Sequence, residues 1–465
     1  MSARHIAVLD VGKTNAKLVL VDAATLDEID VLTRPNRVLP APPWPHFDVV
    51  ALWTFCLDGL ARLHAAHGVD AISVTTHGAA VALLDRDGGL AAPILDYEHD
   101  GPDTVAAEYD AIRPPFAETG SPRRGGGLNL GAQLYWQFGK VPGLQDRVQQ
   151  IVPYPQFWGA RLTGVAASDV TSLGCHTDLW APFERRASSL VARLGVTVKL
   201  APTRRPTEVL GRILPEIAEA TGLSRETVVY CGIHDSNASL LPHLLGRKAP
   251  FGVVSTGTWV IAMAVGGAAV ALDPARDTLV NVNALGDPVP SARFMGGREF
   301  DILTEGQGAD VTEADIQRVL AAGTMVLPSV VQGSGPYPAR KMRWIGEAPA
   351  VGSGRRMAAV SFYLALVTAR CLSLAGHCGP VVVEGPFARN DCYLSMLATA
   401  ADASVCPVAS ATGTAQGAAL LAIEAGGAGA LPAPGAPVVD PVPAYLPYCQ
   451  AWRDRVAEPS AFQST

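Results

Sequence analysis

Residues 5–22 read HIAVLDVGKTNAKLVLVD, and residues 251–264 read FGVVSTGTWVIAMA. Each stretch is an apolar run, a short turn rich in Gly and Thr, and a second apolar run. This pattern predicts two strands joined by a tight hairpin. Because a Gly/Thr turn can direct backbone N–H groups and hydroxyls at a phosphate, the two hairpins together predict a site that holds a polyphosphate from both sides.

A loop with one acidic residue precedes the second hairpin. It reads CGIHDSN over residues 231–237, and its acidic residue is Asp235. Phosphoryl transfer passes through a loose transition state, so its base needs position more than strength. The alternative is a structural aspartate at the start of the next helix, for which Ser236 or Asn237 is the predicted N-cap. With the hairpins, the loop favours an ATP-dependent kinase of a small molecule that uses Asp235 as general base.

The composition limits the classes of protein to consider. The chain has 465 residues, of which 49% are hydrophobic and 17% charged. This is too long for one core and too apolar for disorder, so we expect two large domains. The formal net charge is −7, and no Lys/Arg-rich run occurs. We therefore expect neither nucleic acid nor a membrane surface as a partner.

The sequence also favours a cytoplasmic location. We find no stretch long and apolar enough to span a membrane. The first predicted strand begins within a few residues of the N-terminus, which leaves no room for a signal peptide. The eight cysteines are scattered without a Cys-x-x-Cys pair, so reduced thiols are expected and structural zinc is not.

Apolar periodicity predicts the elements around these loops. In the first half we expect strands at 6–10, 17–21, 71–76, 81–84 and 228–231, and helices at 49–67 and 236–245. Residues 101–230 are otherwise expected to be helical and rich in loops. In the second half we expect helices at 357–375 and 391–401, strands at 380–384 and 405–408, and a last helix opened by residues 412–421. The Gly-, Ala- and Pro-rich stretch 426–443 is expected to be a surface connector.

The order of the motifs resembles that of the FGGY family of carbohydrate kinases over nearly the whole chain. The matching segments are 10–17, 74–78, 161–164, 232–235, 255–259, 384–390, 401–402 and 413–419. The Gly-x-His-Asp loop and the Lys-Thr-Asn of the first turn are more similar to the rhamnulokinase and fuculokinase branch than to the glycerol or xylulose kinase branch. Three features depart from the family pattern: Thr75, Pro386 and the segment 94–100.

This resemblance implies a fold and a division of labour. The fold is the α/β, two-domain actin-like (ribonuclease-H-like) ATPase fold with an interdomain cleft. Residues 1–245 would form the N-terminal sugar-binding and catalytic domain. Residues 246–465 would form the C-terminal nucleotide-binding domain. ATP and Mg²⁺ are the implied cofactors.

The resemblance also implies roles for individual residues. Those implied for phosphate or adenosine are Gly12, Thr14, Asn15, Lys17, Gly257, Thr258, Gly385 and Asn390. Those implied for the sugar are His77, Gly78, His234 and Asp235. Asp10 would hold Mg²⁺ through water, with an ordinary turn-capping aspartate as the alternative. His234 could equally be structural, and a satisfied structural contact is the alternative for His77. Lys13 is an extra charge that fits either a phosphate contact or an exposed surface.

The sequence therefore predicts ATP-dependent phosphorylation of a small sugar, such as a deoxyhexulose, a pentulose or another ketose. One alternative is an actin-like ATPase switch or chaperone-type module without sugar kinase activity. Another is a degenerate kinase that binds sugar only, against which the intact Asp10 and Asp235 argue. The sugar, the hydroxyl and the oligomeric state are left open, and a homodimer is compatible with the sequence.

Overall fold

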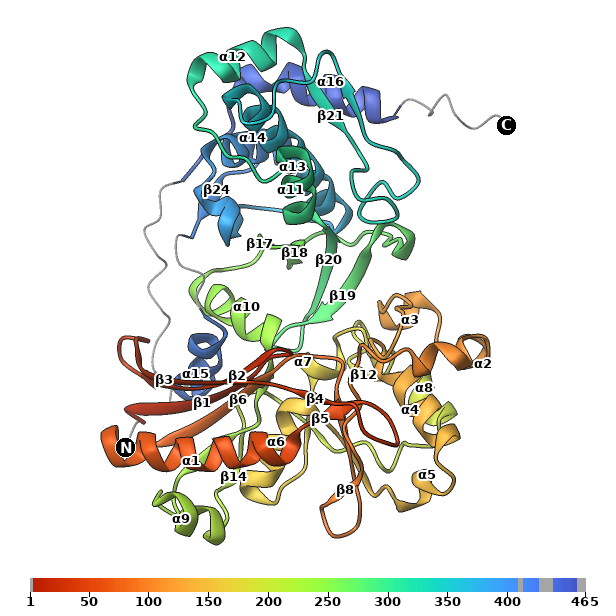
Figure 1. Cartoon of the computed structure of the whole chain (residues 1–465), viewed down its shortest axis with the longest axis vertical. Coiled ribbons are helices and arrows are strands. Elements are labelled where there is room, and N and C mark those ends of the chain that lie inside the picture. Colours follow the sequence, from red (N-terminus) through yellow and green to blue (C-terminus); the bar gives the residue numbers. More distant parts are fainter. Residues whose placement is uncertain (1–2, 409–412, 426–437, 458–465) are drawn as a thin grey trace. The chain divides into compact units, whose positions relative to one another are not determined.

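The computed structural model describes residues 3–408, 413–425 and 438–457 (Figure 1). The chain divides into two compact units. The first unit comprises residues 1–246, 280–288 and 412–432. The second comprises residues 247–279, 289–411 and 433–465. The chain therefore returns to the first unit twice after leaving it at Gly246.

The first unit contains a seven-stranded sheet, and the predicted hairpin supplies the first two of its strands in sequence order. Strands β1 (His5–Val11) and β2 (Asn15–Asp22) pair antiparallel along their whole length, which confirms this hairpin. The sheet order is β14-β15-β6-β1-β2-β3, with β16 also paired to β6. The bounds of the other members are β3 (Glu28–Pro35), β6 (Ala71–Thr76), β14 (Val209–Arg212), β15 (Val228–Tyr230) and β16 (Ile233–His234). Strand β6 runs parallel to β1, β15 and β16, so their carboxyl ends lie at one edge.

Helices cover both faces of this sheet (Figure 1). Helices α1 (Val49–His67) and α6 (Tyr154–Thr163) pack on one face, and α10 (Asp235–Gly246) and α15 (Thr414–Ala425) pack on the other. The Ser73 hydroxyl donates to the carbonyl of Ala418 at 2.8 Å, which fixes α15 to β6. A Cβ on Gly417 would collide with the Ala238 carbonyl, so glycine allows α15 to approach α10. A late segment of the sequence thus completes the core of the first unit.

The remainder of the first unit is a set of short elements, and residues 101–230 contain short strands as well as the expected helices and loops. They are β4 (Val38–Leu39), β5 (His46–Phe47), β7 (Val81–Leu84), β8 (Leu90–Ala92), η1 (Gly101–Val105), α2 (Ala106–Ile112), α3 (Phe116–Thr119), α4 (Leu130–Lys140), α5 (Leu144–Arg147), β9 (Gln150–Pro153), β10 (Ser168–Asp169), α7 (Val170–Leu173), β11 (Trp180–Ala181), β12 (Arg186–Ala187), α8 (Ser189–Arg193), β13 (Thr203–Arg204) and α9 (Pro215–Thr221).

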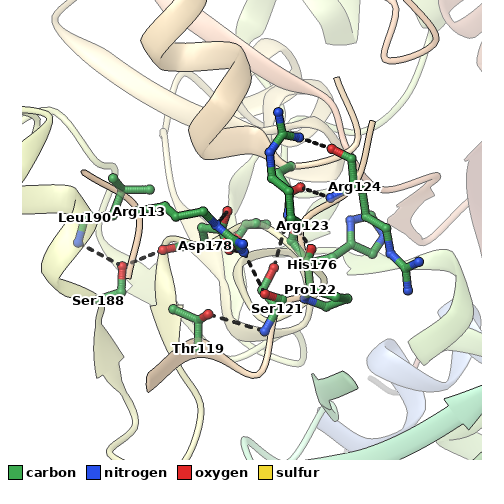
Figure 2. A network of polar contacts seen from close by, with 12 residues as sticks. Arg113, Thr119, Ser121, Pro122, Arg123, Arg124, His176, Asp178, Ser188 and Leu190 are labelled. Carbon is green, nitrogen blue, oxygen red and sulfur yellow. Dashed lines mark hydrogen bonds and ion pairs between the residues drawn. The ribbon is translucent and has the colours of Figure 1, made fainter. Parts of the chain in front are cut away.

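A buried polar network holds these short elements together (Figure 2). The Asp178 carboxylate accepts from Arg113 Nη2 at 2.8 Å and from the Tyr109 hydroxyl at 2.6 Å. The amide of Asn129 donates to the carbonyls of Pro122 at 3.1 Å and His176 at 3.0 Å. Since buried polar groups must be satisfied, this network specifies how the loops 121–124 and 176–178 pack together.

The sheet of the second unit repeats the topology of the first. Strands β17 (Phe251–Thr256) and β18 (Val260–Val265) form the second predicted hairpin. The order is β19-β20-β18-β17-β23-β24, in which β23 (Val381–Glu384) and β24 (Val405–Pro407) run parallel to β17. Strands β19 (Thr278–Val282) and β20 (Pro288–Phe294) extend the antiparallel side. Each hairpin therefore lies between an antiparallel and a parallel neighbour in its own sheet.

The helices of the second unit pack around one long helix, α13 (Gly354–Leu374). It begins three residues before the predicted start because the Ser353 hydroxyl accepts from the Arg356 N–H. The other elements are η2 (Pro274–Arg276), α11 (Gly296–Thr304), α12 (Glu313–Ala322), β21 (Met325–Leu327), β22 (Arg343–Ile345), η3 (Pro386–Arg389), α14 (Asp391–Ala401), η4 (Pro443–Tyr445) and α16 (Leu446–Ala457). Residues 426–437 of the predicted connector lie outside the described residues.

The expectation that no stretch is long and apolar enough to span a membrane was wrong. By length and composition, α1 and α13 both qualify. The charges of α13, Arg355, Arg356 and Arg370, lie near its ends and leave an uncharged middle. Most of α13 is buried among helices and strands of its own unit, and α1 buries the face that carries Leu52, Leu60 and Leu63. Both are accounted for as helices that pack against a core.

Candidate active site

The carboxyl ends of three strands bring the predicted residues of the first unit together. In the register of β1 and β6, Asp10 lies opposite Thr75. In the register of β16 and β6, His234 lies opposite Thr76. His77 directly follows β6, and Asp235 directly follows β16. Asp10, His77, His234 and Asp235 therefore meet at one edge of the sheet. This edge is where ligands commonly bind in open α/β sheets.

Asp10 and Asp235 form a pair of interacting carboxylates. Burial and, next, the negative charge of Asp235 together raise the pKa of Asp10 to about 6, while Lys17 opposes the shift. Oxygen ligands and a local excess of negative charge fit a hard divalent cation. Within residues 3–408, 413–425 and 438–457, no group of three or more His, Cys, Asp or Glu side chains could hold a metal. A Mg²⁺ ion would therefore take most of its shell from water and phosphate, as it commonly does.

Asp235 is the first residue of α10, so the prediction that Ser236 or Asn237 caps this helix was wrong. The Asp235 carboxylate accepts from the adjacent Ser236 N–H at 2.6 Å. Its side chain is 36% exposed, whereas the side chain of His234 beside it is only 6% exposed. The carboxylate therefore combines a fixed position with access for a substrate hydroxyl.

His234 is buried and positively charged. Its backbone N–H donates to the Thr171 hydroxyl at 3.1 Å, and its Nε2 lies 3.4 Å from an Asp235 oxygen. Burial opposes the charged imidazole, but the charges of Cys175 and Asp235 outweigh it and raise the pKa of His234 to about 10. The pKa of the Cys175 thiol is correspondingly lowered, despite its burial, by His176 and His234. His234 therefore presents an imidazolium next to Asp235.

His77 is the opposite case, a buried neutral imidazole. The rings of Phe47, Tyr97 and Tyr154 surround it at centroid distances of 5.0, 5.3 and 5.1 Å. Burial lowers the pKa of His77 to about 4. Its Nδ1 lies 2.7 Å from the Gly78 carbonyl and so carries the proton. Its buried Nε2 has no hydrogen-bond partner among the described residues, which leaves an acceptor for a ligand hydroxyl.

We expect Gly78→Ala to lower kcat by about 100-fold, because misplacement of a site group by about 1 Å can cost this much. A Cβ at Gly78 would lie 2.5 Å from His234 Nε2 and displace the imidazolium from Asp235. Turnover and melting temperature of the purified variant should be measured together. The matched control is Gly139→Ala on α4, where a Cβ meets nothing within 4 Å. Normal turnover in Gly78→Ala would show that the position of His234 is not critical.

The turn of the first hairpin is a tight loop closed by the Gly12 N–H, which donates to the Asn15 carbonyl at 2.9 Å. Asn36 fixes it from outside: its Nδ2 donates to the Gly12 carbonyl at 2.8 Å and its N–H to the Thr14 carbonyl at 2.9 Å. Thr14, Asn15 and Lys17 are exposed and available to a ligand. Lys13 is not exposed, because its ammonium pairs with acidic side chains of the segment 94–98.

The second unit gathers the remaining predicted residues. The Gly257 N–H donates to the Trp259 carbonyl at 3.0 Å, which mirrors the closure of the first turn. Gly257 and Thr258 are exposed. Gly385 has φ +84° and leaves no room for a Cβ beside the Thr256 carbonyl, so the loop after β23 packs on the end of β17.

Asn390 has structural partners that the sequence did not reveal. Its side-chain oxygen caps α14 by accepting from Tyr393 N–H at 3.0 Å, and its Nδ2 donates to the Ser361 hydroxyl at 2.9 Å. Its contact with adenosine remains a prediction. Pro386 begins the 3₁₀ turn η3, whose Phe387 N–H donates to the Thr256 hydroxyl at 3.1 Å. The predicted residues thus form two sets, one in each unit.

Sequence reasoning missed the groups that set the chemistry of these residues. Asn36 hydrogen-bonds to the first turn, and Thr171 accepts a hydrogen bond from the backbone of His234. Cys175 raises the pKa of His234, and the rings of Phe47, Tyr97 and Tyr154 surround His77. Only the adjacency of Cys175 to His176 was a visible signal. The others act across long sequence separations and carry no local motif.

Two family models match the chain. One, described as the N-terminal domain of the FGGY family of carbohydrate kinases, matches residues 5–242. The other, described as the C-terminal domain of carbohydrate kinase FGGY, matches residues 248–430. Among curated proteins, the L-fuculokinase of Escherichia coli (strain K12) is 25% identical over 279 residues, which span 57% of this chain and 57% of the fuculokinase. The chain thus matches little more than half the length of this relative.

Solved structures are similar over nearly the whole chain. A carbohydrate kinase from Novosphingobium aromaticivorans has a TM-score of 0.87 and 37% identity, and the match covers 98% of this chain and 99% of that one. A xyloylose kinase from Brucella ovis has a TM-score of 0.77 at 22% identity, covering 97% and 98%. Plasmodium falciparum glycerol kinase with ADP has a TM-score of 0.77 at 12% identity, covering 98% and 99%. The last two support the two-domain, actin-like fold alone.

Proposed function

Because this chain belongs to the FGGY family of carbohydrate kinases, we propose that it transfers the γ-phosphoryl group of ATP to a hydroxyl of a small sugar. The observation that carries the proposal is the meeting of Asp10, His77, His234 and Asp235 at one edge of the first sheet, next to the turn of the first hairpin. An ATPase switch would need the phosphate turns but not this set of sugar-side groups. We also propose that the first unit binds the sugar, that the second binds the nucleotide, and that the protein acts in the cytoplasm.

In the proposed reaction, Asp235 takes the proton of the attacking sugar hydroxyl. The hydroxyl oxygen forms a bond to the γ-phosphorus while the bond from that phosphorus to the bridging oxygen of ADP breaks. The imidazolium of His234, 3.4 Å from the Asp235 carboxylate, offsets its negative charge. The bare Nε2 of His77 accepts a second sugar hydroxyl and so orients the substrate. These groups supply position, which is the main requirement of a loose transition state.

We propose phosphate contacts for the turn of each hairpin, each taken within its own unit, and adenosine contacts for the loop after β23. Gly12, Thr14, Asn15 and Lys17 of the first turn and Gly257 and Thr258 of the second would donate to phosphate oxygens. Gly385 and Asn390 would lie at the adenosine. When bound, Mg²⁺ would neutralise charge on the phosphate oxygens, and Asp10 is the residue that would hold it.

The proposed substrate class is a ketose, such as a deoxyhexulose or a pentulose. Two findings support it: the 25% identity to L-fuculokinase, and the partly exposed ring of Tyr97 beside His77. The rings of Phe47 and Tyr154 are buried, so Tyr97 is the one of the three that could offer an apolar surface to the C–H face of a sugar. Hydroxyls on the opposite edge would meet Asp235 and His77.

A panel of ketoses, aldoses and polyols tests this function in a coupled assay of ADP release. We expect one ketose to raise ATP turnover by about 100-fold or more over the sugar-free rate, since general acid–base groups contribute at least this much. Mass spectrometry should show one added phosphoryl group on that sugar. Fast ADP release without any sugar would support the ATPase switch instead. No release above background across the whole panel would contradict the proposed kinase.

A further inference from the structure

Lys13 lies in the turn of the first hairpin but is held by groups outside it. Its ammonium forms an ion pair with Asp96 and a second one with Glu98, at 3.2 Å. It also lies over the ring of Tyr97, 4.6 Å from the centroid. The side chain of Lys13 is 18% exposed and that of Asp96 is 10% exposed. Because water is largely excluded, this contact is screened much less than a surface ion pair.

The segment that holds Lys13 is itself anchored. The Asp96 N–H donates to the Pro45 carbonyl at 2.9 Å, and the Phe47 N–H donates to the Ile94 carbonyl at 3.1 Å. The segment 94–98 is therefore tied to the loop and strand before it. A shift of this segment would move the carboxylates that pair with the ammonium of Lys13, and Lys13 would in turn displace the turn of the first hairpin.

Two aromatic rings contact both Lys13 and His77. The Phe47 centroid lies 5.3 Å from Lys13 Nζ and 5.0 Å from the His77 ring centroid. The Tyr97 centroid lies 4.6 Å and 5.3 Å from the same two groups. Burial, with the negative charges of Glu98, Asp96 and Asp235 in decreasing order, raises the pKa of Tyr97 to about 12. His77 and Lys13 thus share two aromatic neighbours, of which Phe47 is buried and Tyr97 is partly exposed.

We propose that Lys13 is a positioning residue that couples occupancy of the sugar side to the geometry of the phosphate turn. The inference rests on the proposed sugar kinase function. A sugar that packs on the partly exposed ring of Tyr97 restricts the segment 94–98, and the ion pair with Asp96 then holds the turn. The turn reaches its productive geometry only with sugar present, so transfer to sugar is favoured over transfer to water.

The rival role for Lys13 is a direct contact with phosphate. The geometry argues against it, because two carboxylates and an aromatic ring already surround the ammonium. Other donors of the same hairpin, Thr14, Asn15 and Lys17, are exposed. The two roles differ in what they predict: a direct contact changes the KM for ATP, whereas a coupling residue changes the sugar kinetics and the amount of wasted ATP.

The test uses the full-length protein with Mg-ATP and the best sugar of the panel. We expect Lys13→Met to lower kcat/KM for the sugar about tenfold and to raise ATP hydrolysis per transfer about tenfold, with KM for ATP within about threefold of normal. Lys13→Arg keeps the charge and should restore most of the loss. Asp96→Asn breaks the same ion pair from the other side and should reproduce the pattern. The double variant should be no worse than the poorer single variant.

Lys140→Met, at an exposed lysine on α4, is the matched control and should behave as wild type. If Lys13→Met does not fold, Asp96→Asn and Lys13→Arg still decide between the two roles. Normal sugar kinetics and normal hydrolysis in Lys13→Met or Asp96→Asn would overturn the coupling role alone, as would a rise only in KM for ATP. A wild-type protein without sugar-dependent ADP release would overturn the proposed function and this inference with it.

Discussion

Asp235→Asn is expected to lower kcat by roughly 100- to 10,000-fold, the usual contribution of a positioned general base. The amide cannot take the hydroxyl proton, although it has nearly the same shape and still suits the start of a helix. The fold and ATP binding should therefore remain intact. Turnover, melting temperature and nucleotide affinity should be measured on the same preparation.

A matched control separates this role from a helix-end effect. Asp391 is the first residue of α14, as Asp235 is of α10. A carboxylate that only favours the helix N-terminus contributes less than about 1 kcal/mol at an exposed position, so Asp391→Asn should change stability slightly and turnover not at all. If Asp235→Asn resembled Asp391→Asn in both measurements, Asp235 would have no part in the chemistry.

Asp10→Asn is expected to lower metal-dependent turnover by about 100-fold or more, on the scale of a lost transition-state contact, and to stabilise the ligand-free protein. Because the pKa of Asp10 is raised from its ordinary value to about 6, the ionised carboxylate is less stable in the folded state than in the unfolded state. At pH 8 this costs about 2–3 kcal/mol. Removing the charge should increase the free energy of unfolding by a similar amount.

The sign of the pH dependence follows from the raised pKa. Above pH 6 the carboxylate is ionised in both states and the cost is complete. As the pH falls through 6, the folded state takes up the proton first and the cost shrinks, and near pH 4 it disappears. Urea unfolding of Asp10→Asn and wild type at several pH values tests this, with Asp58→Asn as an exposed control. Unchanged stability and unchanged Mg²⁺ dependence would reduce Asp10 to a turn residue.

The parts of the fold that could be predicted are those whose residues form a recognisable pattern over a short stretch of sequence. Both hairpins, β6, α1 and α14 have uninterrupted apolar runs or helical periodicity, and the structure confirms them. Strand β3 alternates charged and apolar residues at a mostly exposed sheet edge. It therefore has no apolar run from which a strand could be predicted. Strand β16 has two residues and exists only because β6 is beside it.

The candidate site shows the same limit. Sequence motifs selected His77 and His234 for the sugar side but left a structural role open for each. Their charge states differ because one lies among aromatic rings and the other lies beside Cys175 and Asp235. Cys175 is far from His234 in the sequence, so its contribution depends on the packing of the loop after α7. Charge state is a property of the assembled neighbourhood, and a single sequence does not encode it in any short motif.

The return of α15 to the first unit bears on how the protein forms during synthesis on the ribosome. Ala418, Leu420 and Leu421 are buried, and α15 packs on β1, β6 and α10. Until the ribosome has released this helix, α10 alone covers that face of the first sheet, although every strand of the sheet has been made. The nascent chain must therefore carry an exposed apolar surface while about 170 further residues are translated, a period in which chaperone binding competes with aggregation.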